Sequence, residues 1–211
     1  MKEVSISIHA IENFNTDIIK DLNGLDYIHV DVFDGKFVKN KHDNVDCFKI
    51  LKEYTNIPII AHLMVIDPYS YIEKIIDYVD IFEFHCEAEG NKQLIIDEIK
   101  KRNKKVGVVI NPETQISEIF PFLKDVDLVL VMSVVPGWSG QKFIPETVDK
   151  VKELAKYKDK YGFLIEVDGG INLENARELT PVDILCSAST IFKAEDPNLA
   201  IQLLKESDKL E

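Results

Sequence analysis

Eight short runs rich in β-branched and aromatic residues recur along the whole chain, and segments with helical spacing separate them. The runs span residues 4–8, 27–33, 58–65, 80–85, 105–110, 127–132, 163–168 and 182–187. A helix between two strands carries the chain back along the sheet, so the strands pair in parallel. Eight such units in 211 residues predict an α/β protein with one domain, residues 1–211, folded as a (β/α)8 TIM barrel.

The alternative is an open, doubly wound parallel sheet. That fold usually has fewer strands, and its dinucleotide-binding form carries a G-x-G-x-x-G turn after the first strand, which is absent here. Three intervening segments show the helical pattern well. Residues 15–22 begin with a candidate cap at Asn15 or Thr16, and residues 67–79 and 145–157 repeat apolar residues on one face.

Composition excludes several classes of partner. The net charge is −12, from 25 Lys and Arg against 37 Asp and Glu, so no nucleic-acid surface is expected. No run approaches the roughly 18 apolar residues of a membrane span, and the first apolar run is too short for a signal peptide. The three cysteines, Cys47, Cys86 and Cys186, are odd in number and widely spaced, which indicates reduced thiols in the cytoplasm.

The run HVDVFDG at 29–35 places ionisable side chains in a strand that otherwise resembles core. His29 and Asp31 share one face, because successive strand residues alternate. Burying a carboxylate is costly unless it is paired or bound to a metal. His62 lies late in another strand, and Asp168 closes a third. TIM-barrel active sites lie at the carboxyl ends of the strands, so these four residues predict a site for a divalent transition metal.

Other histidines and one loop are weaker candidates. His9 and His85 also lie at strand ends, where we expect a structural or supporting role, and His42 falls in a polar loop that we expect to be solvated. The stretch VVPGWSGQKF, residues 134–143, follows a strand and contains two glycines and a proline. It predicts a mobile lid that carries Trp138, and an ordinary exposed loop is the alternative.

An anion site is also expected at the loops after the last two runs. Gly169 and Gly170 follow the seventh run, and residues 187–189, Ser-Ala-Ser, follow the eighth. In TIM barrels these loops commonly bind phosphate. Small residues let backbone N–H groups approach an anion closely, so a phosphorylated ligand is predicted.

Six stretches, in chain order, resemble the ribulose-5-phosphate 3-epimerase family. They are IHVDVFDGKFVKN (28–40), AHLMV (61–65), GVVINPET (107–114), LVLVMSVVPGWSGQKF (128–143), IEVDGGINLENA (165–176) and STIFKAEDP (189–197). HVDV, EVDGG and PGxxGQKF together are far more specific than any one of them. The resemblance implies a metal-dependent enzyme that inverts the carbon next to a ketose carbonyl.

The resemblance also implies roles for individual residues. Asp31 and Asp168 match the acid–base pair, and with His29 and His62 they match the ligands of one divalent ion, Zn, Fe, Mn or Co. No nicotinamide or flavin is implied. Two carboxylates suit the reaction, because one removes a proton from one face of the carbon and the other delivers a proton to the opposite face, through an enediolate.

The implied substrate contacts lie on both sides of the site. Met64 and Met132 match methionines that line the reacting carbon, and Gly170 and Ser189 match residues whose backbones hold the phosphate. The family's substrate-binding serine maps to Ser5, with Ser7 as the alternative. The full implied set is Ser5, Met64, Met132, Gly137, Gly140, Gly169, Gly170, Ala188 and Ser189.

Several positions depart from the family pattern. Phe33 stands where the family usually has Met, and residues 39–40 are Lys-Asn in place of Pro-Asn. Residues 41–46 read KHDNVD where a small apolar loop with a glycine is usual. Ser139 and Ala188 occupy positions that usually hold glycine. The metal and acid–base residues are kept while their surroundings are altered, so the reaction type is better supported than the substrate.

Three functions are therefore open on sequence grounds. The first is conversion of D-ribulose 5-phosphate to D-xylulose 5-phosphate in the pentose phosphate pathway. The second is 3-epimerisation of another ketose phosphate, such as allulose 6-phosphate or a heptulose phosphate used for surface sugars. The third is a non-catalytic barrel that binds a sugar phosphate. We expect a phosphorylated ketose as partner, and a homo-oligomer that contacts neither nucleic acid nor membrane.

Overall fold

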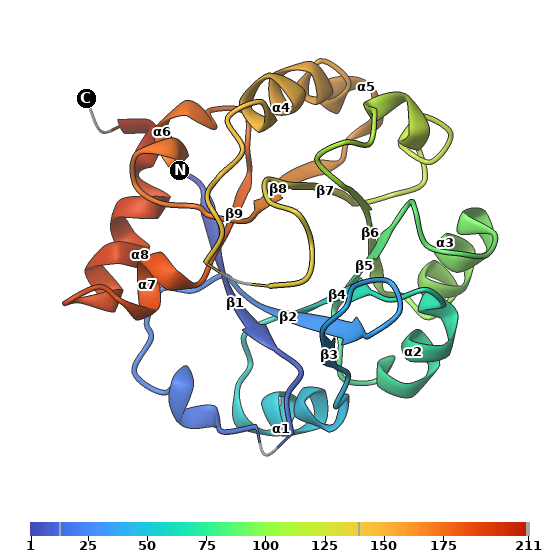
Figure 1. Ribbon diagram of the computed structural model, residues 1–211, viewed down its shortest axis with the longest axis horizontal. Coiled ribbons are helices and arrows are strands. Elements are labelled where there is room, and N and C mark those ends of the chain that lie inside the picture. Colours follow the sequence, from blue (N-terminus) through green and yellow to red (C-terminus); the bar gives the residue numbers. More distant parts are fainter. Residues whose placement is uncertain (13, 139, 210–211) are drawn as a thin grey trace.

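Eight parallel strands close into a barrel in the computed structural model, which describes residues 1–12, 14–138 and 140–209. Around the ring the strand order is β1-β9-β8-β7-β6-β5-β4-β2, and β1 pairs with β2 to close it. Figure 1 looks into this ring, with the helices arranged around it. Because β1 pairs with a strand on both of its edges, the fold is the predicted TIM barrel and not an open sheet.

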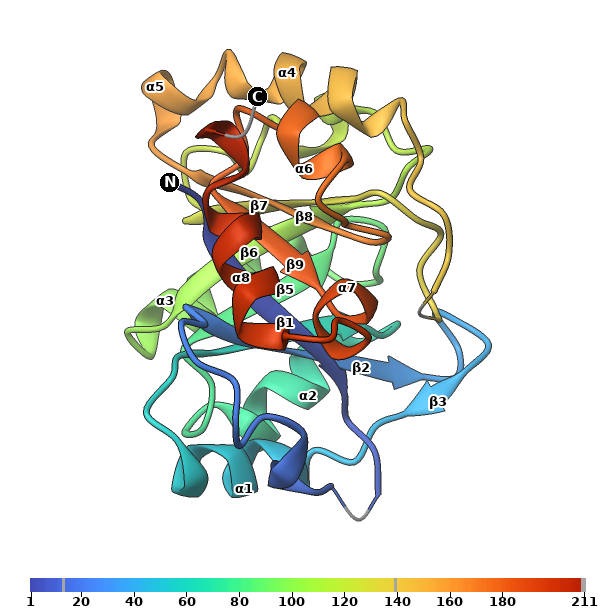
Figure 2. The same ribbon diagram turned by 90° about the vertical axis from the view of Figure 1, so that its left-hand side faces the viewer.

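Each predicted run coincides with a barrel strand to within two residues at either end. The strands are β1 (Glu3–His9), β2 (Tyr27–Asp34), β4 (Ile59–Met64), β5 (Ile81–His85), β6 (Lys105–Ile110), β7 (Leu128–Met132), β8 (Leu164–Asp168) and β9 (Ile184–Ser187). In Figure 2 the carboxyl ends of the strands lie to the right, where the loops after β2 and β7 meet. The helices follow the strands in the order that the alternating sequence pattern predicts.

The α-helices are α1 (Asp46–Tyr54), α2 (Pro68–Ile75), α3 (Lys92–Lys101), α4 (Thr147–Ala155), α5 (Lys158–Tyr161), α6 (Asn175–Glu178), α7 (Ser189–Phe192) and α8 (Pro197–Lys205). Three 3-10 helices are η1 (Thr16–Ile18), η2 (Ile116–Ile119) and η3 (Ser207–Lys209). The helices predicted within 67–79 and 145–157 correspond to α2 and α4. The helix predicted over 15–22 is only η1, capped by the Asn15 side chain. No residue of η1 is buried, so no packed face sustains a longer helix.

A ninth strand was not predicted. β3 (Lys41–His42) pairs antiparallel with the end of β2, with Phe33 opposite His42. The polar loop 41–46 therefore begins as part of a short hairpin at the mouth of the barrel. Two residues are too few for a periodic pattern to show in the sequence.

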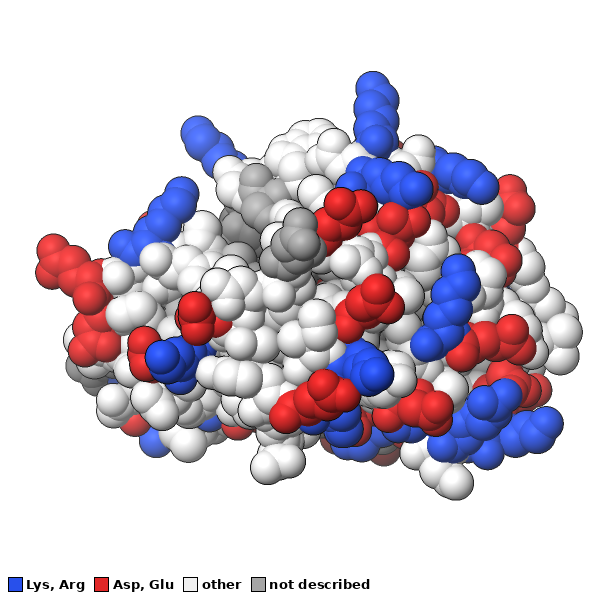
Figure 3. Space-filling view, turned by 90° about the horizontal axis from the view of Figure 1, so that it is seen from below, with Lys and Arg blue, Asp and Glu red and all other residues white. Residues whose placement is uncertain are grey.

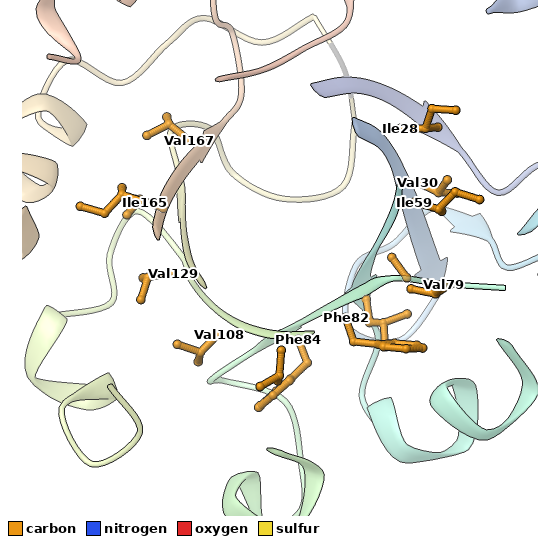
Figure 4. Close-up of a cluster of buried hydrophobic side chains, with 14 of the residues drawn as sticks. Ile28, Val30, Ile59, Val79, Phe82, Phe84, Val108, Val129, Ile165 and Val167 are labelled. Carbon is orange, nitrogen blue, oxygen red and sulfur yellow. The ribbon is translucent and has the colours of Figure 1, made fainter. Parts of the chain in front are cut away.

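The two faces of the barrel wall differ in chemistry. Outward-facing side chains are branched or aromatic and pack against the helices, as Ile28, Val30, Phe82 and Val129 do in Figure 4. On the inner face, β6, β7 and β9 contribute an apolar cluster that includes Leu130. The inner face of β2, β4, β5 and β8 instead carries buried polar side chains, namely His29, His62, Glu83, His85 and Glu166. Buried polar groups need partners, so this half of the interior points to a functional site.

Acidic and basic side chains are interspersed over the face in Figure 3. Cys47, Cys86 and Cys186 are free thiols. Within the described part of the chain, no helix combines the length and apolar character that crossing a bilayer requires.

Candidate active site

Four ionisable side chains meet at the carboxyl ends of three strands. His29 and Asp31 come from β2, His62 comes from β4, where it is the register partner of Asp31, and Asp168 closes β8. One donor atom from each of the four lies within 4.8 Å of the others. His29 and His62 are fully buried, and Asp31 is nearly so. The structure thus brings together all four residues of the predicted metal site.

The spacing of the donor atoms fits a divalent ion. From Asp31 Oδ1, His62 Nδ1 lies at 2.9 Å and His29 Nε2 at 3.3 Å, and 3.1 Å separates the two nitrogens. Ligands about 2.1 Å from a metal are about 3.0 Å apart in an octahedron and about 3.4 Å apart in a tetrahedron. The three separations lie in or close to this interval. Two imidazole nitrogens and two carboxylates also form a donor set that Zn, Fe, Mn and Co accept.

Each histidine turns its second ring nitrogen toward a buried partner. His29 Nδ1 lies 3.1 Å from Glu166 Oε1, and His62 Nε2 lies 2.9 Å from His85 Nε2. A carboxylate only accepts hydrogen bonds, so the contact with Glu166 favours a ring hydrogen on His29 Nδ1. The lone pair of His29 Nε2 then faces the cluster. Metal-binding histidines usually have such a partner behind them. The surroundings of both histidines therefore match those of metal ligands.

Behind the ligands lies a layer of polar side chains, of which only His85 was predicted, in a supporting role. Glu83 and Glu166 are fully buried, and Ser5 Oγ donates to Glu166 Oε1 over 3.0 Å. Burial, together with the charge of Glu166, raises the pKa of Glu83 well above its usual value and so favours its neutral form. The alternation of Glu83 with His85 in the run 80–85 is the sequence signal for this layer.

The two predicted catalytic carboxylates have opposite electrostatic surroundings. Burial alone would raise the pKa of Asp31, but its close contacts with the rings of His29 and His62 outweigh burial and hold that pKa well below the usual range. Burial, and then the charge of Asp31, raises the pKa of Asp168 to about 7. Near neutral pH the metal-free site therefore holds an ionised carboxylate beside one that can carry a proton. Such a pair supplies a base and an acid to one reaction.

A pocket opens over the site, and most of the predicted substrate contacts line it. They are Met64, Met132, Gly137, Gly140, Gly169, Gly170, Ala188 and Ser189, next to Asp31 and Asp168. Ser5 does not reach the pocket, because it is fully buried against Glu166. Ser7 lines the pocket instead, and its hydroxyl donates to Asp31 Oδ2 over 2.8 Å. The structure thus places the alternative serine, Ser7, beside the carboxylate.

The predicted anion loop after β8 depends on glycine. Gly169 has φ of 121° and Gly170 has φ of 63°, both in the left-handed region. A Cβ on Gly170 would lie 2.7 Å from the backbone nitrogen of Phe143, and one on Gly169 would lie 2.5 Å from the side chain of Val134. Asn175 Nδ2 donates to the Gly170 carbonyl over 2.9 Å and holds the turn. Only backbone without a side chain fits at these two positions.

Sequence comparison places this geometry in a known family. The profile of the Ribulose-phosphate 3 epimerase family matches residues 3–192. The ribulose-phosphate 3-epimerase of Bacillus subtilis is 37% identical over 210 residues, which cover 97% of this chain and 96% of the relative. That of Methanocaldococcus jannaschii is 38% identical over 188 residues, covering 87% and 80%. The chain belongs to the ribulose-phosphate 3-epimerase family. It is therefore an isomerase of the epimerase class.

Solved structures of other proteins share the barrel fold of this chain. KGPDC from Streptococcus mutans superposes with a TM-score of 0.73 at 15% identity, covering 99% of this chain and 98% of that chain. The 3-hexulose-6-phosphate synthase of Salmonella typhimurium gives a TM-score of 0.69 at 15% identity, with 97% of each chain covered. At this identity the likeness concerns the fold alone.

In this member of the epimerase family, the predicted lid is joined to the loop after β2. Asn40 Nδ2 donates to the Gly137 carbonyl over 2.7 Å. Trp138 lines the pocket with 56% of its surface exposed. Ser139, one of the departures from the family pattern, lies outside the described residues. Mobility of the lid stays a prediction.

The departure at Phe33 belongs to an aromatic rim at the pocket, which we define as Phe33, His9 and His42. The ring of His9 stands edge-on to Phe33 at 5.3 Å and stacks on His42 at 5.3 Å. Phe33 and His9 line the pocket. His42, which we expected to be solvated, is partly exposed, because β3 brings its ring against these two. In this epimerase the rim is thus built from planar rings.

Proposed function

We propose that the protein is a metal-dependent 3-epimerase of ketose phosphates, which converts D-ribulose 5-phosphate to D-xylulose 5-phosphate. The observation that supports this most directly is the pair Asp31 and Asp168. The two carboxylates come from separate strands, face one pocket and have pKa values driven apart by their surroundings. Membership in the epimerase family supports the same reaction.

Inversion at C3 needs one proton removed and another delivered to the opposite face. Asp31, ionised, accepts the first proton, and Asp168, which is protonated over part of the neutral range, delivers the second. In the reverse reaction the two exchange roles. A divalent ion held by His29, His62 and the two aspartates would neutralise the negative charge that develops on the substrate oxygens.

Other lining residues serve orientation and exclusion of water. The Ser7 hydroxyl, which donates to Asp31 Oδ2, fixes the direction of that carboxylate. Met64 and Met132 offer apolar surface beside the two carboxylates, which limits loss of the enediolate to water. Gly170 and Ser189 bring backbone close to the far side of the pocket, where a phosphate would accept from N–H groups.

A second candidate is 3-epimerisation of a longer ketose phosphate. The aromatic rim favours it, because Phe33 changes pocket shape more than polarity at a position that usually holds a flexible thioether. The third possibility, a non-catalytic barrel, is disfavoured because the intact His2Asp2 cluster has no use in simple sugar-phosphate binding.

A substrate panel tests these alternatives. Purified protein is freed of metal, loaded in turn with Mn²⁺, Fe²⁺, Co²⁺ or Zn²⁺, and assayed with ribulose 5-phosphate, allulose 6-phosphate, a heptulose phosphate and unphosphorylated ribulose. We expect the largest kcat/KM for ribulose 5-phosphate with at least one metal, and far weaker use of the free sugar. A larger kcat/KM for a longer ketose phosphate would favour the second candidate. Absence of epimerisation with every metal and sugar would overturn the proposal.

A further inference from the structure

We propose that His85 and Glu87, at and just after the end of β5, are positioning residues that hold His62 in the tautomer and ring orientation that a metal ligand needs. Neither belongs to the four-residue metal cluster, and neither lines the pocket. The inference rests on the metal site of the proposed function. It is tested by measuring zinc affinity and the positions of the ring hydrogens, and neither measurement depends on epimerase turnover.

Only one hydrogen can lie between the imidazole rings of His62 and His85. His62 Nε2 and His85 Nε2 are 2.9 Å apart, so one donates and the other accepts. His62 Nδ1 is the nitrogen that faces Asp31, at 2.9 Å. For Nδ1 to present its lone pair to an ion, the ring hydrogen of His62 must be on Nε2. His85 Nε2 must then be the acceptor.

Glu87 selects this arrangement from the other side of the His85 ring. Glu87 Oε2 lies 3.4 Å from His85 Nδ1, and this buried nitrogen has no hydrogen-bond partner within the described chain. A carboxylate facing Nδ1 favours a hydrogen there, which leaves Nε2 of His85 free to accept from His62. The carboxylate thus acts on His62 through one intervening ring.

Glu87 is itself held in place by the loop after β6. Its Oε1 accepts from the backbone N–H of Asn111 over 3.0 Å and from the Thr114 hydroxyl. Burial would raise the pKa of Glu87, but the nearby ring of His85 and the hydrogen bonds from Thr114 and Asn111 lower it to about 2. The group is therefore a fixed carboxylate under all ordinary conditions. The loop after β6, which contributes no residue to the metal cluster, therefore acts on His62 through Glu87 and His85.

Packing fixes the plane of the His85 ring. His85 is fully buried, its ring lies nearly parallel to that of His62 with the centres 5.1 Å apart and 20° between the planes, and the Phe37 ring lies 4.7 Å from its centre. His29 has a simpler arrangement, with the carboxylate of Glu166 in direct contact. The carboxylate of Glu166 therefore contacts the ring of His29 directly, whereas the carboxylate of Glu87 acts on His62 only through the ring of His85.

The test measures zinc affinity of the metal-free protein by competition with a chromogenic chelator. His85→Leu keeps an apolar side chain but removes the acceptor, and it should weaken zinc binding about 10–100-fold, the usual cost of losing such a partner. His85→Gln offers an amide oxygen as acceptor and should recover most of that loss. Glu87→Gln should lie between them. Glu113→Gln, an exposed carboxylate in the loop that holds Glu87, is the matched control and should bind zinc as the wild type does.

Nitrogen NMR of zinc-loaded wild-type protein gives a readout that needs no variant. We expect the ring hydrogen on Nε2 of His62 and on Nδ1 of His85. A hydrogen on Nε2 of His85 would overturn the inference, as would wild-type zinc affinity in folded His85→Leu or equal losses in His85→Leu and His85→Gln. Tight zinc binding with the expected tautomers but without epimerisation would leave this inference standing and reject the proposed function.

Discussion

The two halves of the barrel mouth are built on different principles. The proposed metal half uses side chains, namely His29, Asp31, His62 and Asp168, which project from strands and are backed by buried partners. The proposed phosphate half uses the loops after β8 and β9, and Gly169 and Gly170 in the first of these loops bring bare backbone to the pocket. A side-chain site can be disabled by replacing a single ligand atom. A backbone site is instead disabled when an added side chain blocks the close approach of its ligand. Substitutions in the two halves should therefore affect different kinetic parameters.

The largest effect should come from the carboxylates of the metal half. Asp31→Asn and Asp168→Asn should each lower kcat by at least about 10²–10⁴-fold, because each loses a proton carrier and a charged metal ligand. Steady-state kinetics with metal content measured on the same samples checks this, and Glu113→Gln controls for the loss of one exposed charge. Near wild-type turnover in either folded variant would remove the two-carboxylate mechanism.

The phosphate half should respond through binding. In Gly170→Ala the new Cβ would lie 2.7 Å from Phe143 N and reshape the loop, so KM for the phosphorylated ketose should rise about tenfold with little change in kcat. Gly90→Ala is the matched control, because Gly90 also has a positive φ, of 87°, but has open space around it. Both variants should lose roughly 1–3 kcal/mol of stability from backbone strain. An unchanged KM in Gly170→Ala would show that this loop does not hold the phosphate.

Metal binding should be coupled to protons in a direction set by Asp168. Its pKa of about 7 in the metal-free site means that the carboxyl is protonated below pH 7, where the proton competes with an ion for the carboxyl oxygens. Zinc affinity should therefore rise with pH up to about 7, by about tenfold per unit for one proton released. Calorimetry in buffers of different ionisation enthalpy counts the protons. Equal proton release at pH 6 and pH 8.5 would contradict the raised pKa.

The smallest effect should come from the aromatic rim. Phe33→Met replaces a planar ring with a flexible thioether at the pocket wall, and it should change the ratio of kcat/KM between ribulose 5-phosphate and longer ketose phosphates by a few-fold. His42→Phe keeps an aromatic ring against Phe33 and controls for general disturbance of the rim. Identical ratios in wild type and Phe33→Met would show that Phe33 does not set the substrate preference.

The difference between the halves also explains what could be predicted from sequence. His29 and Asp31 are placed on one face by strand alternation alone, so their convergence with His62 and Asp168 follows once the barrel is recognised. The depth of a residue along its strand is harder to predict. Ser5 and Ser7 share a face, and only their separation of about 7 Å along the strand distinguishes them. Their depth depends on the register of β1 with both neighbours, which no local pattern carries.

Contacts between distant segments could not be predicted either. The bond from Asn40 to Gly137, and the contact of Glu87 with Thr114, each join two separate loops. β3 and the half-buried His42 depend in the same way on a two-residue pairing at the end of β2. Such features are fixed by how the loops meet at the mouth, and a single sequence contains no periodic signal for them.

Solvent exchange tests the two-carboxylate account most directly. Metal-loaded enzyme converts ribulose 5-phosphate in D₂O, and mass spectrometry with NMR then locates deuterium in the xylulose 5-phosphate formed. Because one carboxylate removes the C3 proton and the other delivers a proton drawn from solvent, we predict one deuterium at C3 of every product molecule. Product that keeps its original hydrogen at C3 would contradict proton transfer by Asp31 and Asp168.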